Sequence, residues 1–228
     1  MTVKISIIVP TYNEESTILK FQETLRPLNG KCEIIFVDGG STDSTVDLID
    51  PAYTVLHTGK GRACQMNTGA KYSSGDVLFF LHCDSEVPST ALEEIEMVMQ
   101  RYQFGYFGIA FHSESLLMSC CQFMSNRRAK IRRIVFGDQG IFLTRKLFFL
   151  AGGFPEVPIM EDYIFSLDLR RRKVKVGMTK SRIYTSDRRY SDTNAGRLKT
   201  MAQMHYLRAA YRHGMPLEEV ARRYRDIR

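Results

Sequence analysis

The chain has 228 residues, of which 32 are Lys or Arg and 25 are Asp or Glu, so its formal net charge is +7. With 44% hydrophobic and 25% charged residues it has the composition of a globular protein, which excludes a disordered chain, a collagen-like repeat and a disulfide-scaffold miniprotein. The charge is unevenly divided, because residues 1–114 carry a net charge of −7 and residues 115–228 a net charge of +14. This division indicates a polyanionic partner for the second half, or else a set of solvated basic helix faces.

The cysteine content and the hydrophobic pattern predict a cytoplasmic protein. The five cysteines are odd in number and form no Cys-x-x-Cys spacing, which favours reduced thiols. The chain begins with an apolar run and shows no secretory leader. No segment has the roughly 18 to 20 uninterrupted apolar residues of a membrane-spanning helix. We therefore expect any membrane contact to be peripheral, at the inner face.

Three short apolar runs organise the first half of the chain. They cover residues 5–9, 33–37 and 77–81, and each is followed by a polar or glycine-rich turn and a segment of helical period. Continuous apolar runs of this length are typical of strands that helices cover on both faces. The pattern predicts an α/β fold with an open, mostly parallel, Rossmann-like sheet flanked by helices.

Each predicted helix in this half begins with residues suited to capping. We expect Asn13 to cap the first helix, Ser41 or Thr42 the second, and residues 88–90 to open the third. The residues expected on the buried faces are Ile18, Leu19 and Leu25 in the first helix, Val46 and Ile49 in the second, and Leu92, Ile95 and Met99 in the third.

The second half has a less regular pattern. It predicts strands at 104–111, 140–144 and 174–176, and helices at 116–134, 161–172, 196–213 and 216–226. Without internal repeats or a Pro/Gly/Ser-rich linker, residues 1–228 are expected to form one domain with a basic helical extension at the carboxyl end.

Ligands of open parallel sheets bind beyond the carboxyl ends of the strands. At the end of the second run, Asp38 is placed to accept hydrogen bonds from a base or ribose, or only to end the strand and cap a turn. After the third run, Asp84 is a natural oxygen ligand for Mg or Mn. His82, two residues earlier on the same side of an extended chain, is either a further ligand or a structural histidine.

Two other segments have polar residues where helices are predicted to begin. Gly61, Arg62 and Asn67 lie in a segment rich in glycines and cations that suits phosphate, although it is neither a Walker A loop nor a GxGxxG fingerprint. Glu161 and Asp162 begin the helix at 161–172, where acidic residues complement the helix dipole. Alternatively, one of them acts as a general base.

In this order, the motifs resemble those of the family 2 glycosyltransferases, which have the GT-A nucleotide-diphospho-sugar transferase fold. The matching segments are 7–14 (IIVPTYNE), 37–43 (VDGGSTD), 61–69, 75–84, and 152–154 (GGF) followed by Glu161 and Asp162, and together they span about residues 5–172. Residues 62–67 and 137–140 resemble a small soluble bacterial subgroup whose members are labelled radical-SAM-associated or arsenosugar-biosynthesis transferases.

The resemblance implies a role for each matching residue. Those implied to hold the nucleotide-sugar are Pro10, Tyr12, Glu14, Asp38, Gly61, Arg62 and Asn67. Asp84 matches the last Asp of the family's DxD motif and would bind the divalent metal, Mg or Mn, with His82 at the motif's first position. Asp162, next to Glu161, matches the base that deprotonates the acceptor hydroxyl. Residues 1–114 would form the nucleotide-sugar half, and residues 115–228 the acceptor side.

The resemblance also narrows the reaction. The chain has no Trp, so it lacks the QxxRW motif of processive synthases, and Arg188, Arg189 and Tyr190 would take an analogous place near the diphosphate. We expect an inverting, non-processive, metal-assisted transferase that moves a sugar from a nucleotide-sugar, with UDP favoured. Its acceptor would be a small or lipid-like molecule, anionic or lipid-linked.

Two alternatives remain at this point. A sugar-phosphate nucleotidyltransferase would have related architecture, but no GxGTRxxP-type opening follows the first run. A non-catalytic module that binds membrane surfaces or nucleic acid would use residues 115–135, where basic and apolar residues alternate as in an amphipathic helix. No recognised nucleic-acid motif accompanies the charge, so no nucleic-acid partner is expected.

Overall fold

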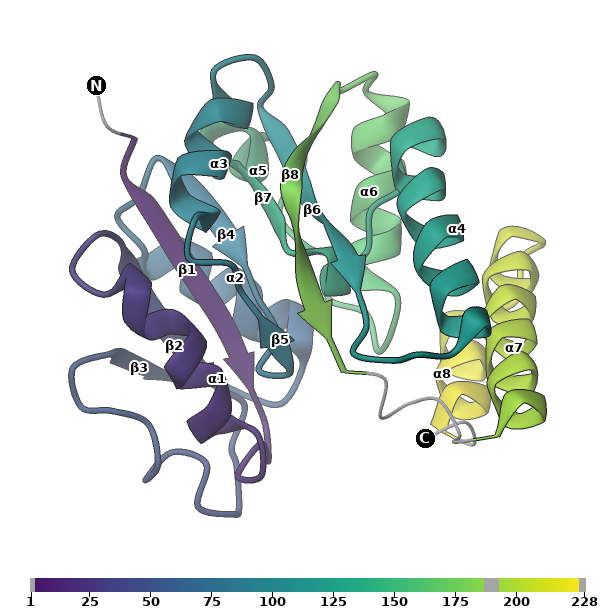
Figure 1. The fold of residues 1–228 in the computed structure, drawn as a ribbon, viewed down its shortest axis with the longest axis horizontal. Helices are drawn as coiled ribbons and strands as arrows, with labels where there is room; N and C mark the ends of the chain where they lie inside the picture. The colour runs from purple at the N-terminus through teal and green to yellow at the C-terminus, as the bar shows by residue number, and fades with distance from the viewer. Residues whose placement is uncertain (1–2, 187–192, 226–228) are drawn as a thin grey trace.

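A computed structural model describes residues 3–186 and 193–225 of the chain, and these form one eight-stranded sheet flanked by helices (Figure 1). The order of strands across the sheet is β3-β2-β1-β4-β7-β6-β8-β5. The strands are β1 (Ile5–Thr11), β2 (Glu33–Asp38), β3 (Thr54–His57), β4 (Val77–Phe80), β5 (Ser85–Glu86), β6 (Phe104–Ala110), β7 (Ile141–Thr144) and β8 (Val176–Thr185).

The helices connect these strands and extend beyond them. They are α1 (Ile18–Leu25), α2 (Arg62–Tyr72), α3 (Ala91–Met99), α4 (Leu116–Arg132), α5 (Arg145–Ala151), α6 (Glu161–Arg171), α7 (Asn194–Arg212) and α8 (Leu217–Arg225), with short 3₁₀ turns η1 (Arg26–Leu28) and η2 (Gly137–Gln139). Figure 1 shows α4, α6, α7 and α8 gathered on the side of the molecule away from β1–β3. None of the described helices combines the length and the apolar character that crossing a membrane requires.

The predicted α/β sheet is confirmed, and its parallel pairs, apart from that of β6 with β8, join strands of the first half of the chain. β1 pairs in parallel with β2 and β4, and β2 pairs in parallel with β3. β7 then pairs antiparallel with both β4 and β6, while β8 runs parallel to β6 and antiparallel to β5. Because β7 runs opposite to β4, the start of β7 lies at the sheet edge where β1, β2 and β4 end.

The apolar runs are continuous because the central strands are buried on both faces. Ile7 and Val9 of β1 belong to the cluster formed with α1 and α3. Ile8, between them, belongs to the cluster formed with α2, α5 and α6. A third cluster joins α6, α7 and α8 and includes Leu207 and Val220.

The helix predicted after Ser41 is absent, which corrects the sequence interpretation. Residues 43–49 form turns instead, although Ile49 is buried as expected. The carboxylate of Asp43 accepts hydrogen bonds from the backbone and the hydroxyl of Thr45, and such local bonds compete with helix formation. Asn13 does not cap α1, because its side chain accepts a hydrogen bond from the backbone N–H of Thr42, 2.9 Å away, and the helix begins at Ile18.

The structure also differs from the sequence predictions in the buried face of α1 and in the bounds of β8. Leu19 is 56% exposed, whereas Ile18 and Leu25 are buried, so α1 has a narrower buried face than expected. The strand predicted at 174–176 shares only Val176 with the observed strand, the ten-residue β8, which begins there. Buried and open residues alternate along β8 because one of its faces is covered only in part. The predictions for Arg188, Arg189 and Tyr190 lie outside the described residues.

Candidate active site

The carboxyl edge of the parallel strands brings most of the predicted residues together. Thr11, at the end of β1, pairs with Asp38, at the end of β2. The backbone N–H of Leu81, just beyond β4, donates to the carbonyl of Ile8 at 3.0 Å, so His82 leaves the sheet beside β1. The first residues of α2 and α6 and the η2 turn lie at the same edge, where ligands of such sheets bind.

Asp38 is a buried carboxylate that organises the turn after β2. It accepts hydrogen bonds from the backbone N–H groups of Gly40, at 3.0 Å, and Ser41, at 3.1 Å. Burial by itself raises the pKa of Asp38, but the hydrogen bonds from Ser41 and Gly40 outweigh it, so the pKa lies below its ordinary value. His57 on β3 lies 3.5 Å from the same carboxylate. The structural role considered for Asp38 is therefore present, whatever it also binds.

Gln65 holds the ends of β1 and β2 together, a role that the sequence interpretation did not give it. Its buried side-chain amide donates to the carbonyl of Thr11 at 2.6 Å and to that of Val37 at 2.8 Å. A Cβ at Gly39 would lie 2.9 Å from Gln65 Nε2, so the turn needs a glycine there. The sequence pattern that could have indicated this role is an uncharged polar residue, Gln65, between the apolar or small residues Cys64 and Met66 in the first turn of a predicted helix.

Three of the residues predicted to hold a nucleotide, Pro10, Tyr12 and Glu14, lie at the end of β1 and in the loop after it. The ring of Tyr12 lies under the ammonium of Lys60, whose Nζ is 4.1 Å from the ring centroid. Glu14 donates its backbone N–H to Thr45 Oγ1 at 2.7 Å. The carbonyl of Pro10 accepts from the thiol of Cys83, 3.7 Å away. These loops are therefore held together by local polar contacts.

Arg62 and Glu161 form an ion pair between the first residues of α2 and α6. Arg62 Nε lies 2.9 Å from Glu161 Oε1, and the Glu161 side chain is only 4% exposed. Burial raises the pKa of Glu161, with Arg62 opposing the shift. Burial lowers the pKa of Arg62, but the charges of Glu161, Asp162 and Asp84 outweigh it and raise the pKa. Arg62 therefore stays a cation close to three of the predicted acidic residues, beside Gly61, whose φ is +150°.

Asp162 has both carboxylate oxygens in short hydrogen bonds to backbone. Oδ2 accepts from the N–H of Gly137 at 2.6 Å, and Oδ1 accepts from the N–H of Tyr163 at 2.6 Å. A Cβ at Gly137 would lie 3.3 Å from Asp162 Oδ2 and 2.9 Å from His82 Nε2. The imidazole of His82 and the carboxylate of Asp162 thus approach the same glycine.

Arg128 supports the η2 turn from α4. Its Nη2 donates to Gln139 Oε1 at 3.0 Å, and its guanidinium lies 3.7 Å from the ring centroid of Phe136. The same Gln139 oxygen accepts the backbone N–H of Phe136. Burial lowers the pKa of Arg128 to about 10. Arg128 and Gln139 were missed as site residues because their effect on Asp162 passes through the Gly137 backbone.

Asn67, predicted to reach the donor's phosphates or ribose, has both ends of its amide on another loop. Its Nδ2 donates to the carbonyl of Phe154 at 2.8 Å, and its Oδ1 accepts the N–H of Phe154 at 2.9 Å. Gly153 has a φ of +74°, and a Cβ there would lie 2.8 Å from Asn67 Oδ1. In the structure, the side chain of Asn67 therefore attaches the loop at 152–154 to α2.

Asp84 and His82 are the residues considered for a metal ion. No three His, Cys, Asp or Glu side chains gather into a metal-binding group within residues 3–186 and 193–225. A Mg or Mn ion bound with a diphosphate needs only one or two protein ligands, because phosphates and water complete its shell. The half-buried Asp84, close enough to Arg62 to affect its pKa, fits such a site.

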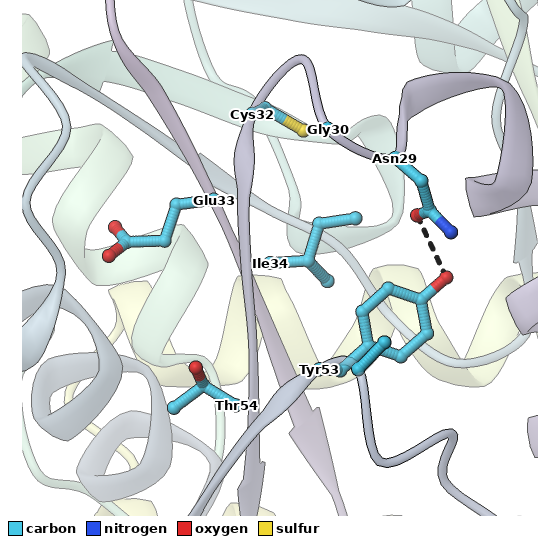
Figure 2. A pocket seen from close by; sticks show the side chains of 8 residues that line it. Asn29, Gly30, Cys32, Glu33, Ile34, Tyr53 and Thr54 are labelled. Carbon is cyan, nitrogen blue, oxygen red and sulfur yellow. Dashed lines mark hydrogen bonds between the residues drawn. The ribbon is translucent and has the colours of Figure 1, made fainter.

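Two cavities of similar size lie in different places. A cavity of about 280 Å³ lies beside Asp84, between α1, β5 and β8, with Lys20 and His112 both bonded to Glu86 at 2.7 Å at its wall. The other, of about 270 Å³, lies at the opposite edge, where β2 and β3 begin. Figure 2 shows Tyr53 bonded to Asn29 there, and none of the predicted site residues.

Comparison with known proteins agrees with the predicted family over the first half of the chain. Residues 6–116, just under half of the chain, match the family described as glycosyl transferase family 2. The bactoprenol glucosyl transferase of Shigella phage SfV is 30% identical over 114 residues, which cover 45% of this chain and 36% of the relative. The chain thus spans about a third of the length of the curated relatives it matches.

Solved structures with this fold bind nucleotide-sugars. The mannosyltransferase PcManGT from Pyrobaculum calidifontis, in complex with GDP-Man and Mn²⁺, superposes with a TM-score of 0.70 at 16% identity, over 100% of this chain and 70% of that one. TarS from S. aureus, in complex with UDP-GlcNAc, superposes with a TM-score of 0.65 at 17% identity, over 81% of this chain and 59% of that one. The chain therefore has the GT-A fold, and over residues 6–116 it is similar to the family 2 glycosyltransferases.

Proposed function

We propose that this protein transfers a sugar from a nucleoside-diphosphate sugar, with UDP favoured, to a hydroxyl group of its acceptor, with inversion at the anomeric carbon. One observation carries the proposal: the carboxylate of Asp162 and the cation of Arg62 converge at the sheet edge where Asp38 and Asp84 also lie. Base, cation and metal ligand are the groups that displacement of a nucleoside diphosphate requires.

The roles follow from the geometry and charge. Asp162, whose oxygens are fixed by two backbone N–H groups, takes the proton of the acceptor hydroxyl as it attacks. Arg62 stabilises the negative charge that grows on the leaving diphosphate. Glu161 keeps Arg62 in place. Asp38 and Tyr12, on the loops after β2 and β1, take the nucleoside.

Asp84 would hold the divalent ion, with His82 as a second ligand. When bound, Mg or Mn would supply charge stabilisation to the diphosphate. The protein's own contribution here is the position of Asp84, four residues after the end of the buried β4 and close to Arg62.

We propose an anionic or lipid-linked acceptor, reached from the cytoplasmic side of the membrane. The curated relative named a bactoprenol glucosyl transferase supports this acceptor class. The strongly basic second half of the chain supports it as well. Residues 62–67 and 137–140 support the radical-SAM-associated or arsenosugar subgroup.

Asp162→Asn tests the base. We expect it to lower the rate of sugar transfer by about 10² to 10⁴-fold, the usual contribution of a general base. Asp168→Asn is the matched control, because it makes the same change on the exposed side of α6, where Asp168 pairs with Arg172. The assay measures nucleoside diphosphate released from a panel of nucleotide-sugars with Mg or Mn. Transfer by Asp162→Asn at the wild-type rate, or release of pyrophosphate instead, would contradict the proposal.

Calorimetry of UDP binding tests Asp84. We expect UDP to bind more tightly with Mn than without it, and Asp84→Asn to remove most of that difference. Asp76→Asn, an exposed change before β4, is the control. If Mn strengthens UDP binding equally in wild type and Asp84→Asn, Asp84 does not hold the metal.

A further inference from the structure

The outward face of α4 carries large apolar side chains that nothing in the described structure covers. Leu116 is 83% exposed, Phe123 63%, Met124 57% and Ile131 63%. At 100° per residue these four positions fall within one arc of the helix. An exposed apolar arc of this kind marks a surface that meets a partner.

Basic residues share this face. Arg127 lies within the apolar arc, and Lys130, Arg132 and Arg133 follow at the carboxyl end of the helix, all of them exposed. Within residues 3–186 and 193–225, Arg127, Lys130 and Arg132 form no ion pair. The face therefore combines apolar side chains with positive charge that no acidic residue of the described part of the chain neutralises.

The neighbouring helix α7 adds to the positive charge. Burial and the nearby guanidinium groups, those of Arg208 and Arg212 on α7 and of Arg128 and Arg132 on α4, lower the pKa of His205. Leu198 and Tyr206 of α7 are exposed apolar residues as well, and Tyr206 accepts a hydrogen bond from Arg223 of α8. Figure 1 shows α4 and α7 next to each other at one side of the molecule.

A neighbouring side of α4 touches the candidate active site. Arg128 on that side holds Gln139 of η2, and the adjoining Gly137 holds Asp162. A surface bound to the outward face of α4 would therefore lie one helix away from the proposed base.

We propose that the outward face of α4, made of Leu116, Phe123, Met124, Arg127, Lys130 and Ile131, docks on an anionic phospholipid surface, together with Arg132 at the exposed end of the helix. The apolar side chains enter the boundary between headgroups and acyl chains, and the basic side chains bind the lipid phosphates. A second copy of the chain fits less well, because a two-fold contact would bring like charges together. This inference goes beyond sugar transfer and does not depend on it, since lipid binding requires no donor.

Vesicle sedimentation without nucleotide-sugar tests the proposal. We expect the full chain to pellet with phosphatidylcholine vesicles that contain phosphatidylglycerol, and about tenfold less protein to pellet with vesicles of phosphatidylcholine alone. In 0.5 M salt, where the Debye length is roughly 5 Å or less, screening should reduce the pelleted protein by about the same factor. Phe123→Ser with Ile131→Ser, and separately Arg127→Gln with Lys130→Gln and Arg132→Gln, should each reduce binding about tenfold or more.

Matched controls make the result specific to α4. Met97→Ser with Leu150→Ser removes two exposed apolar side chains from α3 and α5. Arg101→Gln with Lys146→Gln and Lys175→Gln removes three exposed charges elsewhere. We expect both controls to bind like wild type, and all variants to keep the wild-type thermal midpoint within about 2 °C. Equal binding to neutral vesicles, equal loss in the controls, or a dimer that the α4 variants dissociate would overturn the proposal. Asp162→Asn should still bind vesicles, so failure of the proposed catalysis remains distinguishable.

Discussion

The ion pair between Arg62 and Glu161 gives the sharpest prediction about stability. Arg62→Met keeps most of the side-chain volume and removes the only cation that the structure pairs with Glu161 among the described residues. Breaking a fully buried pair costs about 3–5 kcal/mol, and an exposed pair about 0–1 kcal/mol. Because Arg62 is 35% exposed and Glu161 4%, solvent screens part of the effect, and we expect about 2 kcal/mol at pH 7.

The free-energy cost of Arg62→Met should increase with pH. Burial raises the pKa of Glu161 in the folded state above the value of about 4.3 for an unfolded chain, so the folded protein holds this proton more tightly. The associated stability is therefore present below the unfolded pKa and is lost as the pH rises through the folded pKa. Without Arg62 the loss of stability on deprotonation of Glu161 is larger, so the free-energy cost of Arg62→Met should be smaller at pH 4 than at pH 7.

A double-mutant cycle measures the pair directly. Arg62→Met, Glu161→Gln and the double variant are unfolded in urea and followed by far-UV circular dichroism, since the chain has no Trp. At pH 7 we expect a coupling free energy of about 2 kcal/mol, and a thermal midpoint about 4–8 °C lower in Arg62→Met. A coupling free energy near zero at pH 7, or one of equal size at pH 4 and pH 7, would refute the reasoning.

Three further outcomes follow from contacts described in the structure. Gly69→Ala places a Cβ 2.5 Å from Ile8 Cγ2 and should lower the free energy of unfolding by about 1–3 kcal/mol in urea titration. Burial raises the pKa of Cys32 to about 11, so at pH 8 its alkylation, followed by mass spectrometry, should be far slower than that of an exposed cysteine. Gly137→Ala places a Cβ 2.9 Å from His82 Nε2 and 3.3 Å from Asp162 Oδ2, and should lower the rate of sugar transfer, measured as nucleoside diphosphate released, about 10²-fold by displacing both side chains. These predictions would be contradicted by an unchanged free energy of unfolding in Gly69→Ala, by alkylation of Cys32 as fast as that of an exposed cysteine, or by sugar transfer at the wild-type rate in Gly137→Ala.

The parallel part of the sheet could be predicted because its signals are local. Each buried strand is a continuous apolar run, and the glycines after β2 mark a turn. The first residues of α2 and α6 could be chosen as site residues from their charge, and the structure brings Arg62 and Glu161 into contact.

The remaining features depend on partners far away in the chain. Asn67 is hydrogen-bonded to the backbone of Phe154, 87 residues later in the chain, and no local sequence pattern predicts that bond. Asp162 is held by the backbone of Gly137, a group that every residue except proline carries. β8 alternates open and buried positions and is longer than its apolar content suggests. Turns stand where a helix was predicted after Ser41, because side-chain oxygens accept hydrogen bonds from backbone N–H groups of that segment: Glu15 from Ser44 and Asp43 from Thr45.

The strand order has a consequence for how sequence similarity relates to folding. The family match ends at residue 116, yet β6 lies inside the matched segment and pairs only with β7 and β8, among the described strands, both of which come later. A fragment cut at 116 would leave β6 with two unpaired edges and Asn67 without Phe154. The recognisable half is thus not an autonomous folding unit. Substitutions in the second half that change the acceptor must therefore leave β7 and β8 able to pair with β4 and β6.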